Sequence, residues 1–83
     1  MKNNNKNIFS ENLIRLRKKY GLTQNELAKL SGVSRRMITY YETHPAEPSI
    51  KRVGKIAKVL NVTIEELVGY KELNVKLNDD FSN

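Results

Sequence analysis

Apolar residues recur every three or four positions in five stretches of this 83-residue chain, a spacing that predicts amphipathic α-helices. The first stretch runs from Phe9 to Tyr20, and Ser10 is its expected N-terminal cap. Because side chains three and four residues apart share one face of a helix, one side of this stretch should be buried. The residues on that side are Phe9, Leu13, Leu16 and Tyr20.

Two short helices joined by a tight turn are predicted between Thr23 and Glu42. Thr23, with Glu26 three residues later, has the pattern of a capping box, which starts a helix at about Gln24. Gly32 allows the positive φ that would end this helix sharply. The apolar stripe of this helix is expected to be Leu27, Ala28 and Leu30.

The second helix of this pair has two faces of different character. Ser34 is placed to cap it. One face is apolar and should be buried; it consists of Val33, Ile38 and Tyr41. The other face is polar, basic and free; it consists of Arg35, Arg36, Thr39 and Tyr40.

A loop and two more helices follow. Two prolines between residues 43 and 49 exclude a continuous helix there. Ser49 then caps a fourth helix, and Thr63 with Glu66 forms a second capping box that opens a short fifth helix ending at Gly69. The inner face of the fourth helix is expected to hold Ile50, Val53, Ile56, Ala57 and Leu60.

The two ends of the chain differ from this helical part. Residues 1–7 are almost all Asn and Lys and predict a disordered, solvated arm, either without a role or reaching DNA. In residues 70–83, Leu73, Val75 and Leu77 alternate with polar residues, which is typical of a loosely ordered tail or of a short strand that pairs with a second copy. We therefore expect one domain over residues 8–69, flanked by an arm and a tail.

The pair of helices resembles the helix-turn-helix of lambda-repressor and Cro proteins, often called the XRE family. The residues that stand at the family's spacing are Gln24, Leu27, Ala28, Gly32, Val33, Ile38 and Glu42. The likeness covers about residues 9–69 and implies an all-α, five-helix, lambda-repressor-like DNA-binding domain. The chain departs from the family just after Glu42, where Thr43 and His44 replace the usual glycine.

The resemblance also implies roles for individual residues. The second helix of the motif would lie in the major groove, where Arg35 and Arg36 would each meet a guanine or a phosphate. Gln24 matches a family residue that touches the DNA backbone, and Arg17 matches an arginine that pairs with the glutamate at the position of Glu42. The expected DNA-binding residues are Gln24, Ser34, Arg35, Arg36, Thr39, Tyr40 and Ser49, with Arg17 and Glu42 as a structural ion pair.

Charge and composition narrow the function further. The net charge is +6, and residues 1–69 hold 13 basic and 6 acidic side chains, a local balance of +7 that favours a polyanionic partner. With no cysteine and one histidine, His44, we expect no enzyme activity, no metal and no cofactor. No apolar run reaches membrane-spanning length, and residues 1–7 lack the core of a signal peptide, so we expect a cytoplasmic protein without membrane contact.

These features together predict a transcriptional regulator that binds a specific double-stranded DNA site. A repressor of phage, mobile-element or antitoxin type is expected, acting as a homodimer on a palindromic operator, since one recognition helix reads only a few base pairs. The alternative is a protein-interaction module, in which the same fold holds a protein partner and DNA binding is weak. A strong salt dependence of binding to random duplex DNA would favour the first function.

Overall fold

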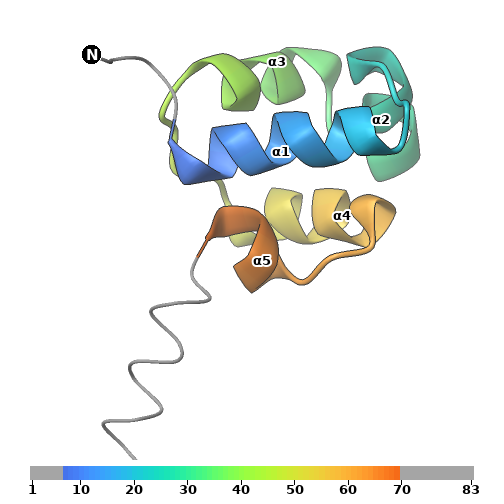
Figure 1. Ribbon diagram of the computed structural model, residues 1–83. Coiled ribbons are helices and arrows are strands. Elements are labelled where there is room, and N and C mark those ends of the chain that lie inside the picture. The colour runs from blue at the N-terminus through green and yellow to red at the C-terminus, as the bar shows by residue number, and fades with distance from the viewer. Residues whose placement is uncertain (1–6, 70–83) are drawn as a thin grey trace, which may run out of the picture.

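The computed structural model describes residues 7–69, which form five α-helices (Figure 1). The helices are α1 (Ile8–Lys19), α2 (Gln24–Ser31), α3 (Arg35–Thr43), α4 (Ile50–Leu60) and α5 (Ile64–Val68). No strand occurs in this part of the chain, so the prediction of an all-α, five-helix domain is confirmed. Of the predicted arm, residues 1–7, the structure describes only Asn7, which is the N-cap of α1, and the predicted tail after Gly69 lies outside the described residues.

Helix α1 runs through the middle of the domain, with α3 on one side and α5 on the other (Figure 1). Helix α2 packs against both α3 and α4, and α4 packs against α5, so the chain closes around one apolar core. Burial of this surface is the main force that holds the five short helices together. The core residues are Phe9, Leu13, Leu16, Leu27, Val33, Ile38, Tyr41, Val53, Ile56, Ala57, Leu60 and Leu67.

The cap of α1 differs from the sequence prediction. Asn7, not Ser10, is the N-cap, and its side-chain oxygen accepts a hydrogen bond from Ser10 N at 3.0 Å. Ser10 is fully buried instead, and its Oγ donates to Tyr41 O at 2.6 Å and lies 3.0 Å from His44 O. The serine therefore ties α1 to the end of α3, because these carbonyls at the end of a helix need donors.

Three residues predicted to be buried are exposed. Tyr20 is the C-cap of α1 and lies beyond the last turn that the core covers. Leu30 is 62% exposed on the outer side of α2, since α3 and α4 contact the side that carries Leu27. Ile50 is 73% exposed because it is the first residue of α4, before the helix crosses the core. The apolar stripes of α2 and α4 are thus one residue narrower than predicted.

The described helices are short, and the longest, α1, has 12 residues. Within residues 7–69, no helix has the length and apolar character needed to cross a membrane.

Candidate nucleic-acid interface

The N-terminal end of α3 presents two arginines to solvent. Gly32 has φ +77°, which ends α2 in the left-handed conformation that glycine favours and lets the chain turn at once into α3. Ser34 caps α3 by accepting a hydrogen bond from Met37 N at 3.1 Å. Arg35 and Arg36 follow directly in the first turn, and both are exposed. The turn and the cap together hold this pair at a fixed place on the surface.

The opposite face of α3 anchors the helix in the core. Ile38 and Tyr41 are buried there, and the ring of Tyr41 meets that of Phe9 edge to face at 5.2 Å. Val33, just before the helix, is also buried. Since buried residues fix the rotation of α3 about its axis, Arg35, Arg36 and Tyr40 must face outward.

The N-terminal end of α4 has the same design. Ser49 caps it by accepting a hydrogen bond from Arg52 N at 3.2 Å. Lys51 and Arg52 lie in the first turn and are exposed. The structure therefore places Ser49 at the start of a different helix from the other predicted DNA-binding residues, beside two basic residues that the sequence analysis did not assign to the site.

The first turns of α3 and α4 carry no acidic side chain, whereas those of α1, α2 and α5 do. The N-terminus of a helix is a partial positive charge, so Asp and Glu stabilise it and Lys and Arg destabilise it. Two helix ends that combine exposed amides with exposed cations favour an anion such as a phosphate. This unfavourable placement of cations is a feature of α3 and α4 alone among the five described helices.

Below the basic face lies the ion pair that the family resemblance implied. Arg17 Nε donates to Glu42 Oε2 at 2.6 Å, and Arg17 Nη2 donates to Glu42 Oε1 at 3.1 Å. Arg17 Nη1 also donates to Leu22 O at 2.8 Å. The two side chains are 13% and 5% exposed, respectively, so this fork links α1, the following turn and α3 in a largely dry setting.

Gln24 is engaged inside the domain rather than extended into solvent. Its Nε2 donates to Glu42 Oε1 at 2.9 Å, and its Oε1 accepts from Thr39 Oγ1 at 2.9 Å. An amide nitrogen carries two hydrogens, so Gln24 keeps one N–H for an external acceptor. This link between Gln24, Glu42 and Thr39 was not predicted from the sequence. Helical spacing places all three residues near the contact of α2 with α3, but it does not give the distances between their side chains.

Tyr40 is supported by the residues that replace the family glycine. Its ring stacks on the ring of His44 with centroids 4.6 Å apart and an angle of 22°. Thr43 Oγ1 donates to Thr39 O at 2.8 Å and lies 2.9 Å from His44 Nδ1. The imidazole therefore covers one face of the Tyr40 ring. The tyrosine is still about half exposed, so its phenol group lies at the surface.

The described residues contain no group of three His, Asp or Glu side chains that would hold a metal ion. The polar groups brought together on this face are those of Arg35, Arg36, Thr39, Tyr40 and, through Thr39, Gln24. They are cations and polar hydrogen-bonding groups gathered on one face of α3, which is the arrangement that suits DNA.

Comparison with known proteins agrees with this geometry. A helix-turn-helix family profile matches residues 13–67. An Archaeoglobus fulgidus protein named as an uncharacterized HTH-type transcriptional regulator is 49% identical over 51 residues, which make up 61% of this chain and 73% of the relative. The cryptic phage CTXphi transcriptional repressor RstR of Vibrio cholerae is 35% identical over 68 residues, covering 82% of this chain and 61% of RstR.

A solved structure of SinR, the master regulator for biofilm formation, in complex with DNA has the same fold. It is similar with a TM-score of 0.68 and 28% identity, over 71% of this chain and 95% of the SinR chain. The family resemblance seen in the sequence is thereby confirmed. Because the family profile spans well over half of its length, the chain belongs to the helix-turn-helix family of DNA-binding transcriptional regulators.

Proposed function

We propose that this chain represses transcription by occupying a specific duplex operator in the cytoplasm. The observation that carries the proposal is the basic, acid-free first turn of both α3 and α4, where Arg35, Arg36, Lys51 and Arg52 surround two serine-capped helix ends. Cations at these positions are unfavourable for the isolated fold. An anion bound there is attracted both by the helix end and by the cations, so it offsets their mutual repulsion. Duplex DNA supplies such anions at regular spacing.

In the proposed complex the N-terminal end of α3 enters the major groove. Arg35 and Arg36 then face base edges, where an arginine fork binds the O6 and N7 atoms of guanine. Tyr40, one turn further along, contacts a thymine methyl or a phosphate. The second N–H of Gln24 and the amides near Ser34 and Ser49 donate to phosphates, which fixes the position of the domain on the duplex.

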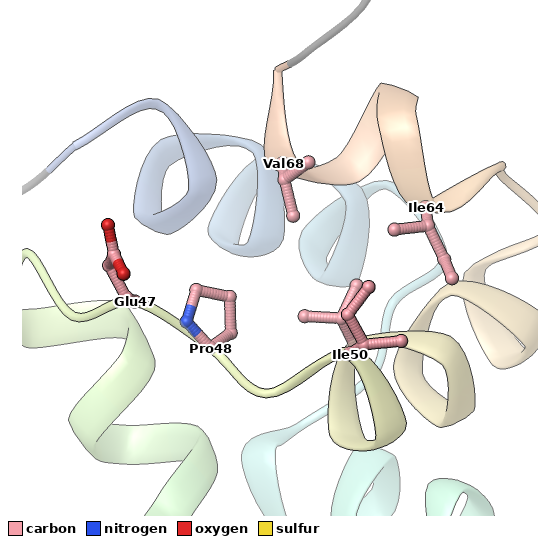
Figure 2. A pocket seen from close by; sticks show the side chains of 6 residues that line it. Glu47, Pro48, Ile50, Ile64 and Val68 are labelled. Atoms are coloured by element: carbon pink, nitrogen blue, oxygen red, sulfur yellow. The ribbon is translucent and has the colours of Figure 1, made fainter.

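We further propose that the regulator is a homodimer, joined through an apolar hollow between α4 and α5. The hollow has a volume of about 130 Å³, and Ile50, Ile64 and Val68 project into it from the two helices, beside Pro48 and Glu47 (Figure 2). Ile8 and Ile50 are 58% and 73% exposed. Ile8, which touches Gly69, extends this apolar surface toward the start of α1, where a second hollow shares Pro48 and Val68 with the first.

A second copy is the occupant that this surface fits best. A two-fold axis brings one patch against its own copy, so the exposed Ile50 of each protomer would be covered by the patch of the other. Helices α4 and α5 lie on the side of α1 away from α3 (Figure 1), so a contact through them would leave both recognition helices free for DNA. Two linked half-sites also provide the specificity that one helix lacks.

Sedimentation of an Ile50→Glu variant tests the dimer. The buried charge should shift the equilibrium from dimer to monomer, because nothing in the apolar hollow compensates it. Leu30→Glu is the matched control, since Leu30 is also exposed but lies on α2. An Ile50→Glu protein that sediments like the parent would contradict the proposed interface.

Selection from a pool of random duplexes tests the function. The parent protein should enrich one palindromic sequence, and its affinity should fall roughly a hundredfold or more between about 50 and 200 mM salt as counterions compete for phosphates. A promoter fused to the selected site should then be silenced when the protein is present. Failure to enrich any sequence, together with salt-independent binding, would favour a protein-interaction module instead.

A further inference from the structure

A chain of hydrogen bonds connects the interior of the domain with the proposed DNA-reading face. It starts at Glu42, which is held by the Arg17 fork, passes through the Gln24 amide and ends at the Thr39 hydroxyl. Both links from Gln24 measure 2.9 Å. Thr39 is partly exposed and lies one helical turn beyond Arg35 and Arg36 on the same face of α3.

The Glu42 carboxylate determines which group donates and which accepts in each of these hydrogen bonds. The Glu42 carboxylate paired with Arg17 only accepts hydrogen bonds, so Gln24 must turn its NH₂ group toward it. That orientation points the amide oxygen of Gln24 at Thr39, and an amide oxygen also only accepts. Thr39 must therefore give its single hydroxyl hydrogen to Gln24, and only lone pairs and the γ-methyl group remain for an outside partner.

We infer that Thr39 is a specificity-determining residue that accepts a hydrogen bond from the amino group of an adenine or a cytosine. The inference rests on the proposed function, because it requires α3 to lie in the major groove. In that groove adenine N6 and cytosine N4 are donors, whereas guanine O6 and N7 and thymine O4 are acceptors. A hydroxyl whose hydrogen is already donated to Gln24 meets the first pair favourably and repels the second.

The hydrogen-bond chain makes this preference different from that of an ordinary threonine. A freely rotating hydroxyl is both donor and acceptor, so it would tolerate an amino or a keto base at the same position. Here the polarity set by Arg17 and Glu42 is carried through Gln24 to the surface. Gln24 is accordingly a positioning residue for Thr39, in addition to any phosphate that its second N–H meets.

Parallel duplex selection with four variants tests the inference, with base preference at each operator position as the readout. For the parent, one position should favour adenine or cytosine over guanine or thymine by roughly five- to tenfold, the worth of one hydrogen bond. Thr39→Val removes the acceptor and should abolish the preference at that position alone. Thr39→Ser keeps the hydroxyl and should retain it.

A Gln24 variant tests whether the preference depends on the orientation of the Thr39 hydroxyl and not only on its presence. Gln24→Met keeps the length of the side chain but cannot orient Thr39, so the preference for amino bases should relax at the same position although the hydroxyl is still present. Thr43→Val is the matched control, because the Thr43 hydroxyl takes no part in the hydrogen bonds between Glu42, Gln24 and the Thr39 hydroxyl. It should leave the preference unchanged. Helical circular dichroism of every variant confirms that it is folded.

Two results would overturn the inference. One is a Thr39→Val protein whose preferences match those of the parent at every position. The other is a folded Gln24→Met protein that keeps the full preference for amino bases, because the direction of the Thr39 hydroxyl would then not depend on its hydrogen bond to Gln24. Neither result is the same as failure of the proposed function, which would show as a parent protein that enriches no sequence at all.

Discussion

The N-terminal ends of α2 and α5 differ from those of α3 and α4 at the third helical position. All four helices have a Thr or Ser cap that accepts a hydrogen bond from the backbone at that position. In α2 and α5 the residue there is Glu26 or Glu66, whose carboxylate accepts from the cap's own backbone N–H at 2.8 or 2.9 Å. In α3 and α4 the residue is Met37 or Arg52.

The difference shows how one local motif serves two purposes. A capping box satisfies two of the free amides and places a carboxylate at the positive end of the helix, so the ends of α2 and α5 attract an outside anion less than those of α3 and α4. A serine cap followed by cations satisfies one amide and leaves the positive end exposed. The fold therefore gives up roughly 0.3–1 kcal/mol for each unfavourable cation in α3 and α4. These are the two helix ends that we propose to face DNA.

The largest effect on stability should come from the buried ion pair of Arg17 with Glu42. Arg17→Met or Glu42→Gln alone should lower the free energy of unfolding by about 3 kcal/mol or more, because either change leaves a polar partner buried without compensation. The double apolar variant Arg17→Met with Glu42→Leu should recover much of the loss. Small effects in thermal melts of both single variants would show that the pair does not hold α1 to α3.

The next largest effect concerns the exposed arginines of α3. Arg35→Ala and Arg36→Ala should each weaken operator binding, and at least one should relax the base preference at one position by roughly 1–3 kcal/mol. Neither should alter helix content, because both side chains are exposed. Equal affinity of both variants and the parent for the selected site, measured by fluorescence anisotropy, would place the reading face elsewhere.

The capping box of α5 should affect stability without affecting DNA binding. Thr63→Ala removes the cap of α5 and should destabilise the domain by about 1 kcal/mol, since the amide of Glu66 loses its acceptor. Operator affinity should be unchanged at a temperature where the variant is fully folded. Denaturant titration gives the first quantity and anisotropy the second; a loss of affinity would mean that α5 also takes part in binding.

The smallest effect should come from giving α4 the capping box that α2 and α5 have. Arg52→Glu gives α4 the Ser-x-x-Glu pattern of a capping box and should stabilise the domain by about 0.5–1 kcal/mol. The same change should weaken DNA binding and reduce its salt dependence, as one phosphate contact is lost. The reverse exchange, Glu66→Arg in α5, is the control and should lower stability only.

The local signals in the sequence located four of the five helix starts. Thr23, Ser34, Ser49 and Thr63 all cap the helices predicted for them, because capping depends on residues three positions apart. Ser10 was misassigned because its partners, Tyr41 O and His44 O, lie more than thirty positions away in the chain. The exposure of Leu30 and Ile50 likewise depends on where neighbouring helices end, which periodicity does not specify.

The same limit applies to the candidate site. The sequence identified the residues on the free face of α3 from spacing and family resemblance. It did not reveal that Gln24 bonds to both Glu42 and Thr39, since those contacts join α2 to α3 across the turn. Nor did it indicate that His44 stacks on Tyr40, because residues four apart on α3 and its cap meet only if their rotamers agree.

The most direct test is a paired measurement on the charge-reversed variant Arg35→Glu with Arg36→Glu. Operator affinity and thermal stability would be measured on the same protein, with the parent alongside. We expect at least a hundredfold loss of affinity, roughly 3 kcal/mol, together with a melting temperature equal to or above that of the parent, because acidic residues suit the N-terminal turn of α3. Retained affinity, or a loss of affinity that merely follows a lower melting temperature, would contradict it.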